Sequence, residues 1–475
     1  MVFSSVIFIF AFLPVCLFGY YGIFRKSRKW QNYFLVACSL LFYSWGGVKY
    51  TLLIVLSVLI NWLLALIIKQ KKQSGKTGQV KTALVAAVVF NVAVLFIFKY
   101  LNFTVSNLNL FLKSEIAVPE IALPIGISFF TFQGLSYVID VYRGHGTALK
   151  NPLNVALYIS FFPQLIAGPI VRYETIAEQI YSRKESFSLF NRGIRRFIIG
   201  LGKKAVLANT LAIIAKQVFS QYYSASALSA WLGAIAFTLQ IYYDFSGYSD
   251  MAIGLGSMFG FSFEENFDHP YISASITEFW RRWHISLGTW FRDYVYFPLG
   301  GSRVKSRTRE YFNLLVVWFL TGMWHGANWT FIIWGLFNFV IILLERITKV
   351  AKSGNRGIRA FGHCYSLVAI IVGWVFFNSA TLGDSIQYLK SMFCIGVPLV
   401  DPYFFFSIKE NALVLIVSLV CCFPIISLLK KRIPQTIQSR TAFRSSAYIA
   451  LALILVLSVS YVVKSAYNPF IYFNF

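Results

Sequence analysis

Acidic side chains are scarce in this sequence, and charge of either sign is thinly spread. Asp and Glu number 18 against 43 Lys and Arg, and these four types make up only 13% of the 475 residues. Hydrophobic residues reach 57%, and the mean hydropathy is +0.65. So apolar a composition excludes an ordinary soluble globular protein and predicts an integral membrane protein. Its fold must be helical, because lipid does not tolerate open sheet edges or bare loops.

Metal-binding, disulfide and common catalytic patterns are also missing. The six cysteines are scattered without CxxC spacing, so we expect neither a metal site nor a disulfide framework. The sequence contains no GxSxG, no HExxH and no Cys–His pair in a plausible context. No internal repeat is visible, which argues against the inverted-repeat plan of many transporters.

The excess of basic residues gives a formal net charge of +25, distributed in short clusters between apolar runs. Five lysines lie in residues 69–81, and 172–204, 281–309 and 430–444 are rich in lysine and arginine. Such clusters are typical of positive-inside retention at the cytoplasmic face. Nucleic acid would need one continuous basic groove, so we expect a lipid bilayer around the protein and no nucleic-acid partner.

The apolar runs predict about 11 or 12 transmembrane helices with both termini outside. The expected spans lie near residues 2–21, 31–45, 51–68, 82–98, 121–141, 200–219, 228–244, 311–324, 328–345, 359–377, 411–429 and 446–463. The stretch "ISFFPQLIAGPIVRYE", residues 159–174, contains two prolines and a glycine and predicts a re-entrant segment. Further along, Ala252, Gly256 and Gly260 recur every four residues, which predicts packing between helices through small residues.

Residues 275–301, "SITEFWRRWHISLGTWFRDYVYFPLGG", begin with an S-x-x-E capping box. The periodicity that follows predicts one amphipathic helix at the cytoplasmic interface, with an aromatic face and a basic face. This helix is either a membrane-surface anchor or part of a binding site. In a binding site, Arg281, Arg282 and Arg292 would face a phosphate-bearing ligand, with His284 near its mouth.

A second histidine stands in "LTGMWHGANW", residues 320–329. The apolar run 311–324 would reach only about 21 Å as a helix, short of the hydrocarbon thickness, so we expect His325 within the membrane. An ionisable residue there usually lines a cavity or a pathway, and Trp324 and Trp329 would form its walls. Imidazole can take a proton from a hydroxyl and return it near neutral pH. The alternative is a structural histidine bonded to a neighbouring helix.

Other polar residues in apolar surroundings are Asp244 and Asp250 in "IYYDFSGYSD", followed by Asn266 and Asp268 in "ENFDHPY". Asp244 could orient a histidine or balance an arginine, although pairing with a base for structural reasons is favoured. The sequence assigns no role to Asn266 or Asp268.

Several of these segments resemble a known family. The stretches "YYDFSGYSDMAIGLG", "FWRRWHISLGTWFRDYVYFPLGG" and "TGMWHGANWTFIIWG" strongly resemble the membrane-bound O-acyltransferase family, and specifically its bacterial branch related to alginate O-acetyltransferase. "LPIGISFFTFQGLSYVIDVYRG", "FFPQLIAGPIVRY" and the terminal "NPFIYFNF" are similar to the same branch. The resemblance implies an all-helical polytopic fold with a funnel through the membrane and re-entrant and interfacial helices. It implies one domain, residues 1–475, with peripheral helices in 1–119, the family core in 120–350 and C-terminal helices in 351–475.

The resemblance also implies the chemistry. An acyl group passes from cytoplasmic acetyl-coenzyme A, a co-substrate and not a permanently bound cofactor, to a hydroxyl of an extracytoplasmic polysaccharide or of a secreted partner acetyltransferase. The essential histidine of the family corresponds to His325. The second polar position of the family corresponds to His284, which would orient the thioester or stabilise its oxyanion. The remaining expected contacts with the substrates are Arg281, Arg282, Arg292, Trp324, Trp329, Asn328 and Asp244. The implied location is the bacterial cytoplasmic membrane.

Two other functions stay open. Family members that D-alanylate teichoic acid take their acyl group from a carrier protein, although the arginine-rich "FWRRWHISL" resembles the acetylating branch. In a transporter or channel, His325 would relay protons and the arginines would attract an anion. That function would predict charge pairs across several spans and repeat symmetry, and neither is evident.

Overall fold

The computed structural model describes residues 1–119, 121–166, 168–221, 225–349, 355–434, 436, 441–464 and 470–471. Every regular element within these ranges is a helix, as the composition predicts. The chain forms two compact units: unit 1 holds Met1–Phe197 and Ser249–Glu264, and unit 2 holds Ile198–Tyr248 and Glu265–Ile471. The single-domain assignment stays a prediction. Of the terminal "NPFIYFNF", only residues 470 and 471 lie within the described ranges.

Unit 1 is built from the N-terminal helices. They are η1 (Phe8–Phe12), α1 (Leu13–Phe18), η2 (Gly19–Ile23), α2 (Arg28–Ser44), α3 (Val48–Gln73), α4 (Thr77–Leu95), η3 (Phe96–Tyr100), α5 (Leu101–Leu112), α6 (Ile127–Arg143), α7 (Pro152–Ser160), α8 (Phe162–Leu165), α9 (Tyr173–Ile176) and α10 (Gln179–Ser182). Two long helices, α11 (Phe187–Gly202) and α13 (Ala227–Met258), each contribute residues to both units.

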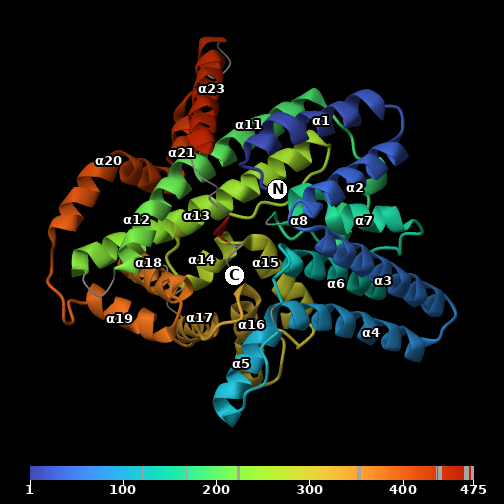
Figure 1. The fold of residues 1–475 in the computed structure, drawn as a ribbon, viewed down its shortest axis with the longest axis horizontal. Helices are drawn as coiled ribbons and strands as arrows, with labels where there is room; N and C mark the ends of the chain where they lie inside the picture. Colours follow the sequence, from blue (N-terminus) through green and yellow to red (C-terminus); the bar gives the residue numbers. More distant parts are fainter. Residues whose placement is uncertain are drawn as a thin grey trace. The chain divides into compact units, whose positions relative to one another are not determined.

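The helices α3, α4 and α6 lie side by side in unit 1 (Figure 1). Asn61 of α3 and Asn91 of α4 are buried, and the Asn91 side-chain N–H donates to Asn61 Oδ1 at 2.8 Å. A Cβ atom at Gly134 of α6 would lie 2.8 Å from Asn61 Nδ2, so glycine is what lets α6 approach this pair. In lipid, such polar pairs and small residues hold helices together, because burying apolar surface brings no advantage there.

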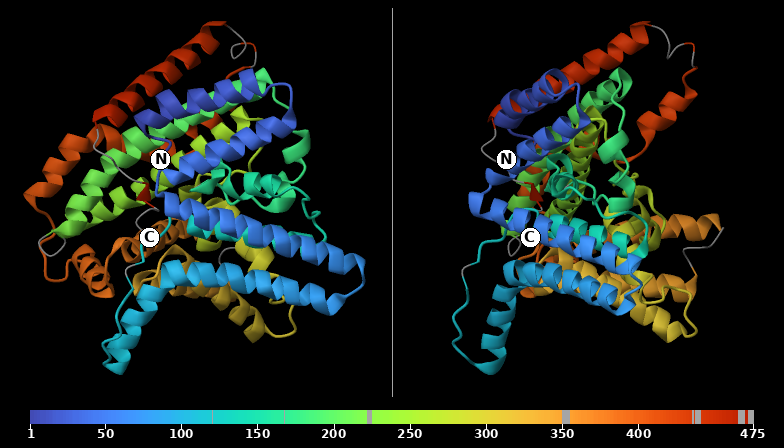
Figure 2. Two further views of the ribbon diagram at one scale, coloured as in Figure 1. Left: turned by 45° about the vertical axis from the view of Figure 1, so that its right-hand side comes forward. Right: turned by 90° about the vertical axis from the view of Figure 1, so that its right-hand side faces the viewer.

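The stretch Thr77–Leu112 contains 36 helical residues, which is too long for one straight crossing of a bilayer. The five π-helical residues of η3 interrupt it between α4 and α5. Figure 2 shows α5 turning away from the axis of α4. The helices α4 and α5 therefore follow different axes and do not form one straight crossing.

Residues 159–174 form no continuous helix. α7 ends at Ser160, α8 is four residues long, and α9 begins at Tyr173. Pro163 lies in the first turn of α8, where its missing N–H removes no helical hydrogen bond. Most side chains of this stretch are buried, and interrupted backbone within a membrane protein needs such protein surroundings. The broken path is in keeping with a re-entrant segment, although its course through a membrane stays a prediction.

Unit 2 is built from the C-terminal helices. They are η4 (Lys203–Ala208), α12 (Asn209–Ser220), η5 (Pro270–Ile272), α14 (Ile276–Arg282), α15 (Ile285–Phe291), η6 (Arg292–Tyr296), α16 (Arg307–His325), α17 (Trp329–Thr348), α18 (Arg356–Asn378), α19 (Leu382–Met392), α20 (Pro402–Cys422), α21 (Ile425–Arg432) and α23 (Thr441–Lys464).

The helices α16 and α17 pack closely against each other in unit 2 (Figure 1). A Cβ atom at Gly335 of α17 would lie 2.5 Å from the Trp318 carbonyl oxygen, and one at Gly322 would lie 2.5 Å from the Phe331 carbonyl oxygen. Larger side chains at these positions would force the helices apart. The crossing lies three residues before His325, so it fixes the end of α16 against α17.

Two local predictions need correction. The helix α16 begins at Arg307 and has 19 residues, so it reaches about 29 Å, and the argument that a short helix places His325 within the membrane is wrong. Its first turn is charged, which is why hydropathy alone begins the helix too late. The close crossing of α11 and α13 in unit 1 uses Gly193 and Gly254, not the predicted stripe of small residues. A Cβ atom at Gly254 would lie 2.7 Å from the Gly193 carbonyl oxygen, whereas Gly256 faces the Phe263 ring.

The chain is a multi-pass membrane protein. Within the described ranges, seven helical stretches are long and apolar enough to cross a bilayer: Val48–Gln73, Thr77–Leu112, Phe187–Ser220, Trp329–Thr348, Arg356–Asn378, Pro402–Cys422 and Thr441–Lys464. The other expected spans overlap helices that are shorter or more polar than these seven stretches. The number of crossings and the placement of both termini outside stay predictions.

Candidate active site

His284 lies at a break between two short helices. The stretch predicted as one amphipathic helix divides into α14, α15 and η6, so that prediction is wrong. The predicted start is confirmed, because the Ser275 hydroxyl accepts a hydrogen bond from the Glu278 N–H at 3.0 Å. His284 itself has a left-handed backbone, with φ 45° and ψ 52°. This conformation is uncommon for a residue other than glycine and costs on the order of 1 kcal/mol.

The segment around Asn266 holds this break in place. The Ile285 N–H donates to the Asn266 carbonyl at 3.0 Å, and the Asp268 N–H donates to the Arg282 carbonyl at 2.9 Å. These bonds satisfy backbone groups that a continuous helix would have paired internally. They also turn His284 inward, and its side chain is buried where the single-helix prediction placed it on the basic face.

The His284 ring makes polar contacts on one side. Its Nδ1 lies 3.1 Å from Asn266 Oδ1, and the same oxygen accepts from the Ser286 N–H at 3.2 Å and from the Ser286 hydroxyl at 2.9 Å. The Phe245 ring stands edge-on to His284, with 4.5 Å between ring centroids. Burial lowers the pKa of His284 to about 3, so the ring is neutral at physiological pH.

His325 is the last residue of α16 and is 4% exposed. Among the residues that the structure describes, aromatic rings lie around it with centroids 4.9 Å away for Trp324, 5.0 Å for Trp334 and 5.1 Å for Phe377. The carbonyl end of a helix carries partial negative charge and favours a cation. This position therefore suits a histidine that accepts a proton during a reaction.

Trp324 joins the two histidines. Its ring centroid lies 5.8 Å from that of His284 and 4.9 Å from that of His325. The structure thus brings together two histidines that are 41 positions apart in sequence around one buried indole. Trp329, the other expected wall, is half exposed at the start of α17, and Trp334 contacts His325 from one turn further along.

Asn328 caps α17. Its side-chain oxygen accepts from the Thr330 N–H at 3.1 Å, and its side-chain N–H donates to the Ala380 carbonyl at 2.9 Å. These bonds fix the turn that follows His325. The geometry therefore gives Asn328 a structural part, and contact with a substrate stays a prediction.

The three predicted arginines differ in how they are paired. Arg282 contacts Asp268 at 2.8 Å and Glu278 at 3.0 Å, and Arg292 contacts Asp293 at 2.8 Å. Arg281 is exposed and forms no ion pair with any residue that the structure describes. Exposed basic residues continue beyond η6 at Arg303, Lys305, Arg307 and Arg309. Of the three predicted arginines, Arg281 is thus the one most readily available to a phosphate.

Asp244 pairs with a buried base, as the favoured interpretation of the sequence expects. Its Oδ1 lies 2.5 Å from Lys204 Nζ, and its Oδ2 accepts from the Ile471 N–H at 2.7 Å. Phe470 lies 5.7 Å from Phe245, the ring that contacts His284. Asp244 therefore ties residues 470–471 to the aromatic surroundings of His284.

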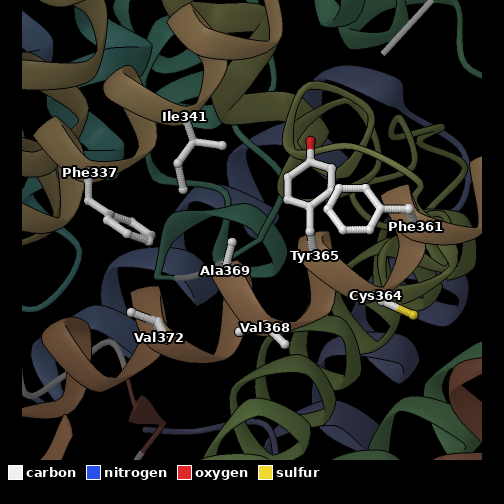
Figure 3. Close-up of a pocket in the computed structure, with 8 residues that line it drawn as sticks. All are labelled: Phe337, Ile341, Phe361, Cys364, Tyr365, Val368, Ala369 and Val372. Carbon is white, nitrogen blue, oxygen red and sulfur yellow. The ribbon is translucent and has the colours of Figure 1, made fainter. Parts of the chain in front are cut away.

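A separate groove lies between α17 and α18 (Figure 3). It has a volume of about 500 Å³ and is lined by Phe337, Ile341, Phe361, Cys364, Tyr365, Val368, Ala369 and Val372. These residues include no histidine and no carboxylate, and both helices are candidate membrane spans. The Tyr365 hydroxyl donates to Glu345, whose carboxylate accepts from the Ile276 N–H at the start of α14. The groove lacks the acid–base groups of the histidine site.

Two buried histidines beside one indole are side chains that can hold and pass a proton where bulk water has little access. The chain belongs to the membrane-bound O-acyltransferase family, whose family model matches residues 40–382. It is an O-acyltransferase, as the motifs predict. It is 37% identical to a probable alginate O-acetylase of Pseudomonas putida over the full length of both chains. It is 42% identical to a probable alginate O-acetylase of Pseudomonas aeruginosa, over 83% of this chain and 75% of the relative. It is 36% identical to the peptidoglycan O-acetyltransferase of Helicobacter pylori, over 82% and 80% of the two chains.

The sequence patterns do not identify several residues that the site contains. Asn266, Phe245, Trp334 and Phe377 all contact one of the two histidines. Asn266 stands out in the sequence as a polar residue in apolar surroundings. It is 18 residues from His284, so no local pattern predicts that the two side chains are in contact. The aromatic residues carry no signal in a chain with 48 phenylalanines and 12 tryptophans.

Proposed function

We propose that this O-acyltransferase moves an acetyl group from cytoplasmic acetyl-coenzyme A to a hydroxyl on the other side of a bacterial cytoplasmic membrane. The observation that carries the proposal is the pair of buried histidines on either side of Trp324. A shielded base can take the proton of an attacking hydroxyl, and a second polar ring beside it can position the substrates.

In the proposed mechanism, His325 takes the proton of the acceptor hydroxyl while the oxygen attacks the thioester carbonyl carbon. The tetrahedral intermediate then collapses, the carbon–sulfur bond breaks, and the imidazolium returns the proton to the leaving thiolate. The products are an O-acetyl ester and free coenzyme A. The end of α16 stabilises the imidazolium, and the aromatic rings around His325 keep bulk water away from the thioester.

The donor is proposed from charge and from the relatives. Acetyl-coenzyme A carries several phosphate charges, and exposed bases lie at Arg281 and along residues 303–309. The three relatives described above are named for O-acetyl transfer, which favours an acetyl donor over a D-alanyl carrier protein.

The acceptor is proposed to be a hydroxyl of an extracytoplasmic polysaccharide, alginate-like or another exopolysaccharide, or of a secreted partner acetyltransferase that passes the group on. The names of the relatives support a cell-surface polymer, since they specify alginate in two cases and peptidoglycan in the third.

The test uses the purified full chain in liposomes of known orientation, with radiolabelled acetyl-coenzyme A outside. We expect release of free coenzyme A by the native protein and a loss of about 10²- to 10⁴-fold in His325→Ala. His145→Ala is the matched control, because His145 is exposed and lies in unit 1. If folded native protein neither binds nor consumes acetyl-coenzyme A with candidate acceptors present, the donor is wrong. A carrier-protein thioester would be tried next.

A further inference from the structure

Asn266 makes an unusual number of hydrogen bonds to the short segment that carries His284. Its backbone carbonyl accepts from the Ile285 N–H, and its side-chain oxygen accepts from both the N–H and the hydroxyl of Ser286. The same oxygen lies 3.1 Å from His284 Nδ1. Asn266 is 1% exposed, so these bonds are made in a dry environment where each one matters more.

The Ser286 N–H settles which atom of the Asn266 amide faces the histidine. A backbone N–H can only donate, so the amide atom 3.2 Å from it must be the oxygen. An amide oxygen can only accept, and the Ser286 hydroxyl, which lies 3.5 Å from His284 Nδ1, donates its hydrogen to the same amide oxygen at 2.9 Å, so we assign the ring hydrogen to Nδ1. In a neutral imidazole only one nitrogen carries hydrogen, so Nε2 bears the lone pair.

The backbone geometry supports the same assignment. His284 reaches Asn266 only because its backbone is left-handed, and such a conformation persists only where its surroundings impose it. The bond between Ile285 and Asn266 imposes it from the main chain. The rings of Phe245 and Trp324 then limit rotation of the imidazole.

We infer that Asn266 is a positioning residue that holds His284 in the tautomer with hydrogen on Nδ1, so that Nε2 acts as a hydrogen-bond acceptor in the acyl transfer. The part concerning catalysis rests on the proposed function. A neutral Nε2 with a lone pair cannot donate to an oxyanion. Of the two roles that the family resemblance implies for His284, the inference therefore selects orientation. The hydrogen bond that His284 accepts comes from an N–H or O–H group of the substrates other than the hydroxyl that His325 deprotonates.

The tautomer can be measured without any substrate. The chain contains only five histidines, so nitrogen NMR of protein labelled at histidine and embedded in bilayers should give few signals, with His284→Gln as the assignment variant. We expect the His284 signals to show a protonated Nδ1 and an unprotonated Nε2. Asn266→Ala should give a mixture of both tautomers, and Asn266→Asp should retain the native one because a carboxylate oxygen also accepts.

Kinetics then test the consequence for catalysis. We expect Asn266→Ala to lower kcat by about 10²-fold or more, because His284 loses both its fixed tautomer and the hydrogen bond that fixes the position of its ring. Asn266→Asp should restore most of the activity and shift the acidic limb of the pH profile to higher pH, because a negative charge favours protonation of His284. In a His284→Ala background, Asn266→Ala should cause no further loss. Asn313→Ala is the control, since Asn313 is equally buried in unit 2 and bonds the Gly301 carbonyl.

The outcomes separate the inference from the proposed function. A native His284 with hydrogen on Nε2 overturns the inference whatever the activity. A kcat of Asn266→Ala equal to that of the native protein also overturns the inference. The same holds if the double variant loses as much kcat as the two single variants combined. Failure of the native chain to use acetyl-coenzyme A overturns the proposed donor, and the NMR measurement still decides the tautomer.

Discussion

The crossing of α16 and α17 offers a sharp test of how tightly the site is positioned. In Gly335→Ala, the new Cβ atom would lie 2.5 Å from the Trp318 carbonyl oxygen, whereas ordinary contact begins at 3.4 Å. The neighbouring atom is backbone and cannot rotate away, so the helices must separate by about 0.9 Å. His325 lies at the end of α16, and Trp334 precedes residue 335 on α17, so the strain falls directly on their contact. A misplacement of about 1 Å can reduce catalysis on the order of 10²-fold.

The matched control is Gly373→Ala in α18, where the nearest atom to a new Cβ is a Phe337 ring carbon at 3.5 Å. Both changes gain about 1 kcal/mol of helix propensity, and only Gly335→Ala pays about 1–3 kcal/mol for overpacking. We therefore expect Gly335→Ala to stay folded in detergent while its coenzyme A release in liposomes falls about 10²-fold. Equal activity in the two variants would refute the reasoning that this crossing positions His325.

Three further predictions concern single interactions. Lys204→Met should lower the free energy of unfolding in mixed micelles by about 3–5 kcal/mol, because it leaves Asp244 buried without its base, and adding Asp244→Leu should recover most of the loss. Asp401 caps α20, and although burial favours its neutral form, hydrogen bonds that it accepts from Ser226, Ser229 and Phe404 hold its pKa below the ordinary 3.8. The ionised Asp401 carboxylate should contribute fully to the free energy of unfolding above pH 3.8, and its contribution should disappear as the pH falls through the lowered pKa. In Asp401→Asn, the free energy of unfolding should therefore fall less steeply at acidic pH. Arg281→Ala should raise KM for acetyl-coenzyme A about 3- to 10-fold with little change in kcat, and a fall in kcat alone would contradict a phosphate contact.

The helical class and most helix positions were predictable, because lipid forces every backbone group to find a partner within its own segment. The expected span at 328–345 begins one residue before α17 and otherwise lies within it, and the one at 359–377 lies within α18. The cap at Ser275 was predictable for a similar reason, since it depends on residues three positions apart. His325 stood out because a titratable ring is rare in so apolar a chain.

The break at His284 could not be predicted, because nothing in "FWRRWHISL" interrupts a helix: the segment contains neither glycine nor proline. The break comes from bonds to Asn266 and Asp268, which are distant in sequence and count only once the chain is folded. The crossing at Gly193 and Gly254 was missed for the same reason. A stripe of small residues marks a helix that can be approached closely, but the partner helix decides which of those residues is used.

The two histidines differ in their local electrostatics, and this difference assigns the proton. His325 ends α16, where the carbonyl dipoles favour a cation, whereas His284 precedes α15, where the first N–H groups disfavour one. Burial lowers the pKa of His284 to about 3, and the Asn266 oxygen keeps its hydrogen on Nδ1. In the proposed mechanism, a proton released from the acceptor hydroxyl therefore goes to His325, while His284 stays neutral and orients the substrates. The backbone groups that a helix leaves unpaired lie at its ends, and in the proposed mechanism two such ends give two identical side chains different roles.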